Sequence, residues 1–422
     1  MTVDRRPSAR DRSVKSFFSR VAAFLGLRRS IVGLLGMVVL VGLGEHMAEQ
    51  FLPLYLIALG GSFLSVGFLN GMDNLLGALY SFPGGYLADR LGTKRALLIF
   101  NLLSMAGFVV VILVPSWMAV MGGAALFLSW TAISLPATMG LVARALPQEK
   151  RTMGVSIHSL VRRVPLALGP IVGGALIGAL GVEVGVRVAF TAALFFAAVS
   201  LILQQALIEP DPPRDSAPRH AEGRPWRLWR EMRPELKQLL VADILVRFCE
   251  QIPYAFVVVW AVGTVAAPGP VTALQFGVLR TIEMATAILI YLPVAYAADR
   301  GRKKPFVIVT FAFFTAFPLV LLASRSFASL AFAFVIRGLK EFGEPTRKAL
   351  IMDLAPEGRK AGTFGLYYLV RDTIVSVGAF GGAFLWSIHP EVNLWAAFAF
   401  GFVGTLWFAW RGKSLGPSAA VG

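Results

Sequence analysis

The chain has 422 residues, of which 56% are hydrophobic and only 15% are charged. A soluble protein carries roughly a quarter charged residues, so the composition excludes an ordinary water-soluble domain. The net charge of +16 would suggest a nucleic-acid partner in a soluble protein. Because the mean hydropathy is +0.69, we attribute this charge to Lys and Arg in cytoplasmic loops, and we expect no nucleic-acid partner.

The first 30 residues are basic and lack an apolar run followed by a small-residue cleavage site. This pattern is not that of a cleavable signal peptide. We therefore expect residues 1–30 to form a basic cytoplasmic tail.

Twelve long apolar segments follow this tail. A helix that crosses the hydrocarbon layer needs about 20 mostly apolar residues, whereas barrel strands are short and alternate. The expected spans are 31–56, 62–87, 96–116, 119–143, 153–179, 186–207, 238–263, 271–297, 305–324, 327–352, 361–387 and 392–410. The sequence therefore predicts an all-α integral membrane protein with twelve transmembrane helices.

The segment 208–237 contains several prolines and shows no apolar periodicity. We expect it to be a linker between an N-terminal bundle (31–207) and a C-terminal bundle (238–410), with a short tail at 411–422. Lys and Arg gather in the tails, the linker and every second loop, whereas the opposite loops and their edges hold only Arg187 and Arg325. This bias predicts a multi-pass protein of the plasma or inner membrane with both termini in the cytoplasm.

The two bundles repeat one pattern. A shift of 210 residues, reduced to 209 after one loop deletion, superimposes matching positions in the two halves. The pairs include Asp73 with Glu283, Asp89 with Asp299, Arg162 with Arg371, and Gly169 with Gly378. Two pseudo-symmetric six-helix bundles are therefore expected.

A conspicuous motif follows the second predicted helix and recurs after the eighth. Its residues are Gly85, Asp89, Arg90, Gly92, Lys94 and Arg95 in the first copy, and Asp299, Arg300, Gly301 and Lys303 in the second. The pattern resembles the signature loop of the major facilitator superfamily. The second copy departs from it by carrying Ala295 at the first glycine and by losing one residue.

The resemblance implies the major facilitator fold and a cytoplasmic latch. In that latch Asp89 would meet the start of helix 11, and Asp299 the start of helix 5. A carboxylate is well placed at a helix N-terminus because it accepts backbone N–H bonds there. The alternative is a topology signal alone, which accounts for the Lys and Arg but not for the Asp and Gly.

The fifth predicted helix carries Gly169, Pro170, Gly173 and Gly174. This set resembles the glycine-proline motif typical of antiporters in the superfamily, although Pro165 stands where that motif often begins with glycine. Small residues also let helices approach closely in lipid, so ordinary packing is the alternative.

Charged side chains inside spans are costly, at about 2.5–3.5 kcal/mol each, so they should face a cavity or a partner. The resemblance implies that helices 1, 4, 7 and 10 line a central cavity. Our candidates for proton coupling are Glu45, Glu49, Asp73, Glu250 and Glu283. Our candidates for the substrate cavity are Arg162, Arg247, Arg337, Glu341, Glu344 and Arg371.

Simple neutralisation of neighbouring charges is the alternative for several of these residues. On this view the pairs are Arg247 with Asp243 or Glu250, Arg337 with Glu341, Glu283 with Arg280, and Arg163 with Asp372 across the halves. Arg162 and Arg371 would clamp an anion or, equally, bond acids and carbonyls to hold the halves together.

Three acids have no cation close by on their own helix. Glu45 and Glu49 have only His46 nearby, and we expect its ring to point to a different face. Asp73 has Asn70 one turn earlier and is therefore the freer acid of its repeat pair.

The resemblance implies a secondary active transporter that works by alternating access. We expect proton-coupled export of a small organic compound; the alternative is uptake or exchange of an organic anion. A rival of another class is a non-transporting sensor or assembly factor on the same scaffold.

The sequence has no P-loop, metal cluster or nucleophile motif, so we expect no enzyme, cofactor or metal. The expected partners are a small-molecule substrate, protons and the bilayer, and we expect a monomer.

Overall fold

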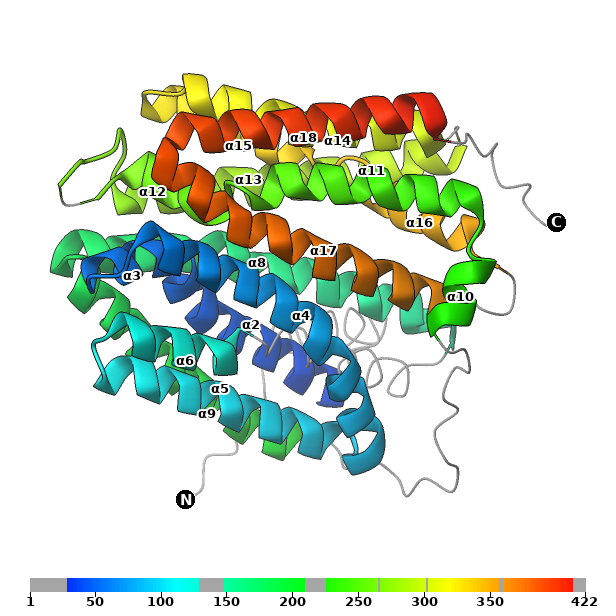
Figure 1. The fold of residues 1–422 in the computed structure, drawn as a ribbon. Helices are drawn as coiled ribbons and strands as arrows, with labels where there is room; N and C mark the ends of the chain where they lie inside the picture. The colour runs from blue at the N-terminus through cyan, green and yellow to red at the C-terminus, as the bar shows by residue number, and fades with distance from the viewer. Residues whose placement is uncertain are drawn as a thin grey trace, which may run out of the picture.

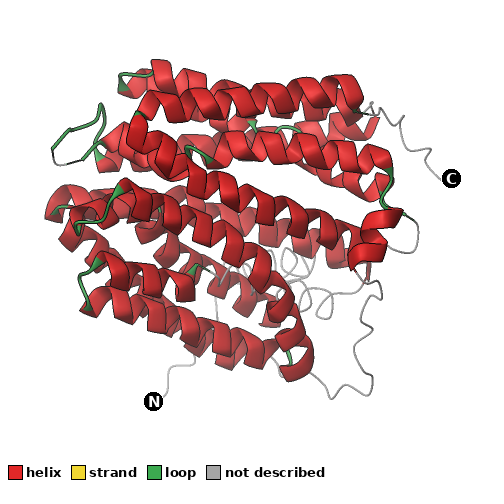
Figure 2. Ribbon diagram, viewed as in Figure 1, coloured by secondary structure: helices red, strands yellow, loops and turns green. Residues whose placement is uncertain are grey.

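The computed structural model describes residues 29–128, 148–208, 225–264, 266–300, 303–356 and 360–412. Helices joined by short loops make up these ranges (Figures 1 and 2). Among the described residues, the β-type pairing is limited to one isolated antiparallel bridge between Gly263 and Pro268. The described residues therefore confirm the all-α fold class.

The N-terminal half begins the chain and contains the repeat's first copy. Its helices are α2 (Arg29–Glu49), α3 (Leu52–Ala58), α4 (Phe63–Leu91), α5 (Thr93–Leu113), α6 (Trp117–Phe127), α8 (Gln148–Leu180) and α9 (Val182–Leu207). In this half α2 packs between α8 and α9, and α5 packs against α6 and α9.

The C-terminal half contains α10 (Pro225–Glu231), α11 (Pro234–Gln251), the 3₁₀ turn η1 (Tyr254–Phe256), α12 (Val257–Val262), α13 (Ala273–Arg300), α14 (Lys303–Ala323), α15 (Phe327–Leu339), α16 (Glu344–Leu354), α17 (Lys360–Ile388) and α18 (Pro390–Arg411). The short helix α10 lies in the segment expected to be a featureless linker, and it packs against α17.

The two halves lie side by side, as Figure 1 shows, with the N-terminal half below and the C-terminal half above. They meet along two helix pairs, α4 with α17 and α8 with α13. In the repeat α4 corresponds to α13 and α8 to α17, so the two interfaces are related by the same pseudo-symmetry.

The described helices have the length and surface that a bilayer requires. Nine of those described are long and apolar enough to cross a membrane, and the shorter α6 is also apolar. Each of the twelve expected spans contains a described helix. Large apolar side chains also point outward, such as Leu289 at 73% and Ile202 at 68% exposure, as expected for a surface that faces lipid.

Three expected spans are broken rather than continuous, and proline or glycine stands at each break. Pro53 lies in the first turn of α3, Pro253 precedes η1, and Pro345 lies in the first turn of α16 after Gly343. Proline lacks the N–H that would continue the helix and clashes with the carbonyl four residues earlier. Regular helical hydrogen bonding is therefore interrupted in spans 1, 7 and 10.

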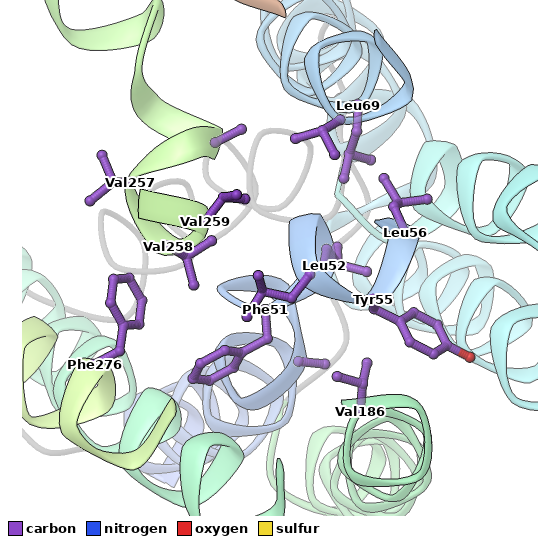
Figure 3. Close-up of a cluster of buried hydrophobic side chains, with 14 of the residues drawn as sticks. Phe51, Leu52, Tyr55, Leu56, Leu69, Val186, Val257, Val258, Val259 and Phe276 are labelled. Carbon is purple, nitrogen blue, oxygen red and sulfur yellow. The ribbon is translucent and has the colours of Figure 1, made fainter. Parts of the chain in front are cut away.

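An apolar cluster joins the halves near these breaks. In Figure 3, Phe51 and Leu52 of the N-terminal half lie opposite the valines at 257–259 and Phe276 of the C-terminal half. The rings of Phe51 and Phe276 meet edge to face with centroids 5.9 Å apart, an arrangement that aromatic pairs favour.

Candidate functional site

A cavity with an empty volume of about 540 Å³ lies between the two halves. Residues at the break of span 1 and on α4 form one wall, and residues at the break of span 7 and on α13 and α15 form the other. Its polar lining consists of Glu49, Gln50, Asn70, Asp73, Tyr254 and Arg337. This volume includes open solvent at the mouth of the cavity, so the enclosed space is smaller.

Asp73 is the acid on the α4 wall of this cavity. Within the described part of the chain it has neither a hydrogen bond nor an ion pair, in keeping with its expected freedom. Its neighbour Asn70 donates to the Gln251 carbonyl at 3.0 Å, and Asn74 donates to the Gln251 side chain at 3.2 Å. The side-chain amides of these two asparagines on α4 thus bind the C-terminal end of α11. The Asp73 carboxylate between them has no partner among the described residues.

Glu49 is placed differently from our expectation. Its carboxylate bonds to Nδ1 of His46 at 2.7 Å, so the prediction that the His46 ring points to another face was wrong. The reason is geometric, because residues three apart on a helix are neighbours. Glu45 is 5% exposed, does not line the cavity, and lies within electrostatic range of Arg162.

Glu283 is the repeat partner of Asp73, but it is held by cations on two helices. Arg280 binds it from α13, as expected from their spacing. From the α15 side, Arg337 lies 3.4 Å and Lys340 3.6 Å from its carboxylate. The expected pair of Arg337 with Glu341 was therefore wrong, because the charged face of α15 is turned toward α13.

The same network continues along α11. Glu250 binds Arg247 at 2.5 Å, as the neutralisation alternative predicted, and also binds Lys340 at 2.7 Å. Arg247 reaches Glu344 at 3.6 Å. Glu344 in turn binds Arg347 of its own helix at 2.7 Å.

Asp243 ends this network in the core of the C-terminal half. Arg347 binds it directly, and both side chains are 1% exposed. The Tyr367 hydroxyl donates to it at 3.0 Å, and Arg371 lies 3.4 Å away. Arg371 also binds Asp372 at 2.7 Å, so it is already engaged by two acids.

Polar contacts across the halves also differ from the expected pattern. Arg163 of α8 lies 3.4 Å from Glu341, in the break between α15 and α16, whereas Asp372 is bound by Arg371. The expected pair of Arg163 with Asp372 was therefore wrong. Nearby, Thr281 of α13 donates to the Ala167 carbonyl of α8 at 2.6 Å.

The glycines of the antiporter-like motif lie against two helices. A Cβ at Gly169 would meet His46 of α2 at 2.9 Å, and one at Gly173 would collide with the Met47 carbonyl. Gly174 faces the backbone of Ala273 on α13 in the same way. These positions let α8 approach both α2 and the opposite half, and Pro170 similarly abuts Gly277 of α13.

Most of the latch lies outside what the structure describes. Gly301 is not described, and neither are the surroundings of Gly85, Asp89, Arg90, Asp299 and Arg300. Gly92 adopts φ 85°, a left-handed conformation that glycine tolerates. Lys94 donates to the Gln205 carbonyl at 2.8 Å, Lys303 pairs with Asp353, and Arg95 is exposed. The two lysines therefore make these contacts within their own halves.

Arg347 is the main functional candidate that sequence reasoning missed. It continues the row of charges on span 10, three residues beyond Glu344, and it is among the most buried large side chains. Extending the spacing of i, i+3 and i+4 by one step would have found it. The cross-half role of Gln251 carries no comparable signal in the sequence.

Comparison with known proteins gives a consistent result. The profile of the Major Facilitator Superfamily matches residues 34–274. Among curated proteins, none matches this sequence. The fold is similar to that of the nucleoside transporter NupG, with TM-score 0.77, 11% identity, and coverage of 91% of this chain and 100% of that one.

Two further solved structures share the fold. The peptide transporter POT in complex with sulfate has TM-score 0.71 and 15% identity, with coverage of 90% of this chain and 94% of that one. The human organic anion transporter MFSD10 (TETRAN) has TM-score 0.63 and 16% identity, with coverage of 90% and 98%. At these identities the similarity establishes the fold and no particular substrate.

Proposed function

Because this chain belongs to the major facilitator superfamily, a family of membrane transporters, we propose that it couples proton movement to export of a small organic compound. The observation that carries the proposal is the cavity between the halves, with the unpaired Asp73 on one wall and Arg337 on the other. A site at the interface of two repeats is where alternating access requires it.

The packing at one end of the cavity supports the transport cycle. Where α4 begins, Gly67 lies against Ala383, and the Phe68 and Phe380 rings lie with centroids 5.5 Å apart. These contacts join α4 and α17 and must separate if the cavity is to open at this end. We propose that this end faces away from the cytoplasm, with both termini on the cytoplasmic side, because of the Lys and Arg bias.

Asp73 is the strongest candidate for the proton carrier. Glu250 and Glu283 are each held by two or more cations, so neutralising either would disturb a network that spans three helices. Asp73 faces the cavity without such partners and can exchange a proton without breaking an ion pair. Glu49, which shares the cavity wall, is its closest rival.

Export rests on the partial antiporter motif, whose glycines let α8 pack on α2 and α13. Exchange or uptake of an organic anion is the second candidate, and Arg337 on the cavity wall favours it. Of the two arginines that the sequence suggests for this role, Arg371 is bound by Asp243 and Asp372.

The test uses the full chain in proteoliposomes that contain a pH-sensitive dye. Compounds that raise the melting temperature of the purified protein are added, and proton movement is recorded. We expect a stabilising compound to drive proton flux in the wild type and none in Asp73→Asn. Glu391→Gln, which alters an exposed acid outside both the cavity and the latch, is the control and should retain flux.

Full flux in Asp73→Asn would exclude this residue as the proton carrier. A compound that binds tightly but is never moved, with or without a proton gradient, would favour the non-transporting alternative.

A further inference from the structure

The charge on the N-terminal wall of the cavity is not compensated. Glu49 has His46 at 2.7 Å, whereas Asp73 has no partner among the described residues. A carboxylate that is largely withdrawn from water and left unpaired is costly. A ligand that supplies a cation at Asp73 would remove this cost.

The opposite wall has the opposite imbalance. The ion-pair network of the C-terminal half contains the cations Arg247, Arg280, Arg337, Lys340, Arg347 and Arg371 and the acids Asp243, Glu250, Glu283, Glu344 and Asp372. Leaving aside the half-exposed Lys348 at its rim, the cations exceed the acids by one. Glu49 on the opposite wall lies within electrostatic range of Arg280 and offsets part of this surplus, so the case for a further negative charge rests on Arg337.

Arg337 is the cation best placed to receive that charge. It lines the central cavity and also a smaller one beside Phe314 and Phe317. Its Nε lies 3.4 Å from Glu283, longer than a good charged hydrogen bond, and the described residues offer it no hydrogen bond. The guanidinium instead lies over the ring of Tyr254, 5.4 Å from its centroid, among other aromatic rings.

Apart from its six polar side chains, the cavity is lined by apolar residues. Pro53 and Leu128 line it from the N-terminal half, and Val257, Val258 and Phe276 line it from the C-terminal half. A ligand that satisfied both charged walls would therefore need an apolar body between or beside its charged ends.

Resting on the proposed transport function, we propose that the substrate is an apolar zwitterion whose ammonium group binds Asp73 and whose carboxylate binds Arg337. Binding of such a molecule neutralises both walls at once and adds no net charge to the membrane interior. A plain cation or a plain anion satisfies one wall only and leaves the other unpaired. The charge pattern thus selects for a molecule with both groups.

The test compares ligands that share an apolar body and differ in charge. The probes are L-phenylalanine, L-phenylalaninamide, which lacks the carboxylate, and N-acetyl-L-phenylalanine, which lacks the ammonium. L-leucyl-L-phenylalanine serves as a longer zwitterion. Binding to the full chain is measured by calorimetry in detergent.

We expect one of the two zwitterions to bind the wild type at least about thirtyfold more tightly than either singly charged probe. Asp73→Asn should lose this zwitterion preference and favour the N-acetyl probe. Arg337→Gln should lose it and favour the amide. Arg337→Lys keeps the charge and should retain part of the preference, which separates loss of the site from misfolding.

Equal binding of a singly charged probe and the zwitterions would overturn the inference, as would failure of both zwitterions to bind. The proposed function is judged separately. If another compound drives proton flux that requires Asp73 while no zwitterion binds, the transport proposal stands and the zwitterion inference falls.

Discussion

Replacing Arg347 by methionine should destabilise the C-terminal half strongly. Arg347 binds Asp243 in a pair whose side chains are each 1% exposed, and it also binds Glu344 at 2.7 Å. Methionine fills a similar volume but leaves Asp243 without its closest cation. The loss of stability therefore measures the cost of leaving a buried carboxylate without its cation, and not the cost of creating a cavity.

The size of the effect follows from what remains around Asp243. Removing one partner of a buried ion pair costs about 3–5 kcal/mol. Asp243 keeps the Tyr367 hydroxyl at 3.0 Å and Arg371 at 3.4 Å, so we expect the lower end, about 3 kcal/mol. At about 2–4 °C per kcal/mol for a unit of this size, the melting temperature should fall by roughly 6–12 °C.

The assay is thermal unfolding of the purified protein, with two further variants as controls. Lys348→Met removes a neighbouring cation that is 49% exposed, and its effect should stay within about 0.5 kcal/mol. The double variant Asp243→Leu with Arg347→Met removes both charges and should recover much of the lost stability. An unchanged melting temperature in Arg347→Met, or simple additivity in the double variant, would refute the reasoning.

Two other predictions concern the interface between the halves. Gly173→Leu should abolish transport and lower stability, because its side chain would collide with the Met47 carbonyl; Gly178→Leu, with nothing within 4 Å, should be tolerated, and equal effects would count against close packing. Arg163→Glu should cost about 1 kcal/mol of thermal stability, and combining it with Glu341→Arg should restore it. Failure of the double exchange to recover would argue against that cross-half pair.

The sequence was sufficient for the features that repeat or lie on one helix. Apolar runs predicted the nine described helices that are long enough to cross a membrane, and local spacing predicted the pairs Arg280 with Glu283 and Arg247 with Glu250. These succeed because helix geometry alone brings residues three or four apart together. Our expectation for the His46 ring neglects this rule, and the structure bonds that ring to Glu49.

Partners on different helices could not be predicted in the same way. Spacing shows which residues share a face, but not how that face is rotated toward its neighbours. For this reason the neutralisation alternative pairs Arg337 with Glu341, whereas the structure pairs it with Glu283. It likewise pairs Arg163 with Asp372, whereas the structure pairs it with Glu341. The apolar runs predict continuous spans across Pro53 and Pro253, where the structure has the breaks that line the cavity.

The most direct test of alternating access joins the two halves where α4 meets α17. Phe68 and Phe380 are replaced by cysteine in a Cys249→Ser background, since Cys249 is the chain's single native cysteine. A short, reducible cross-linker is then applied in proteoliposomes, and substrate-driven flux is measured before and after reduction. We predict that cross-linking stops flux and that reduction restores it, whereas undiminished flux through the cross-linked protein would contradict the account.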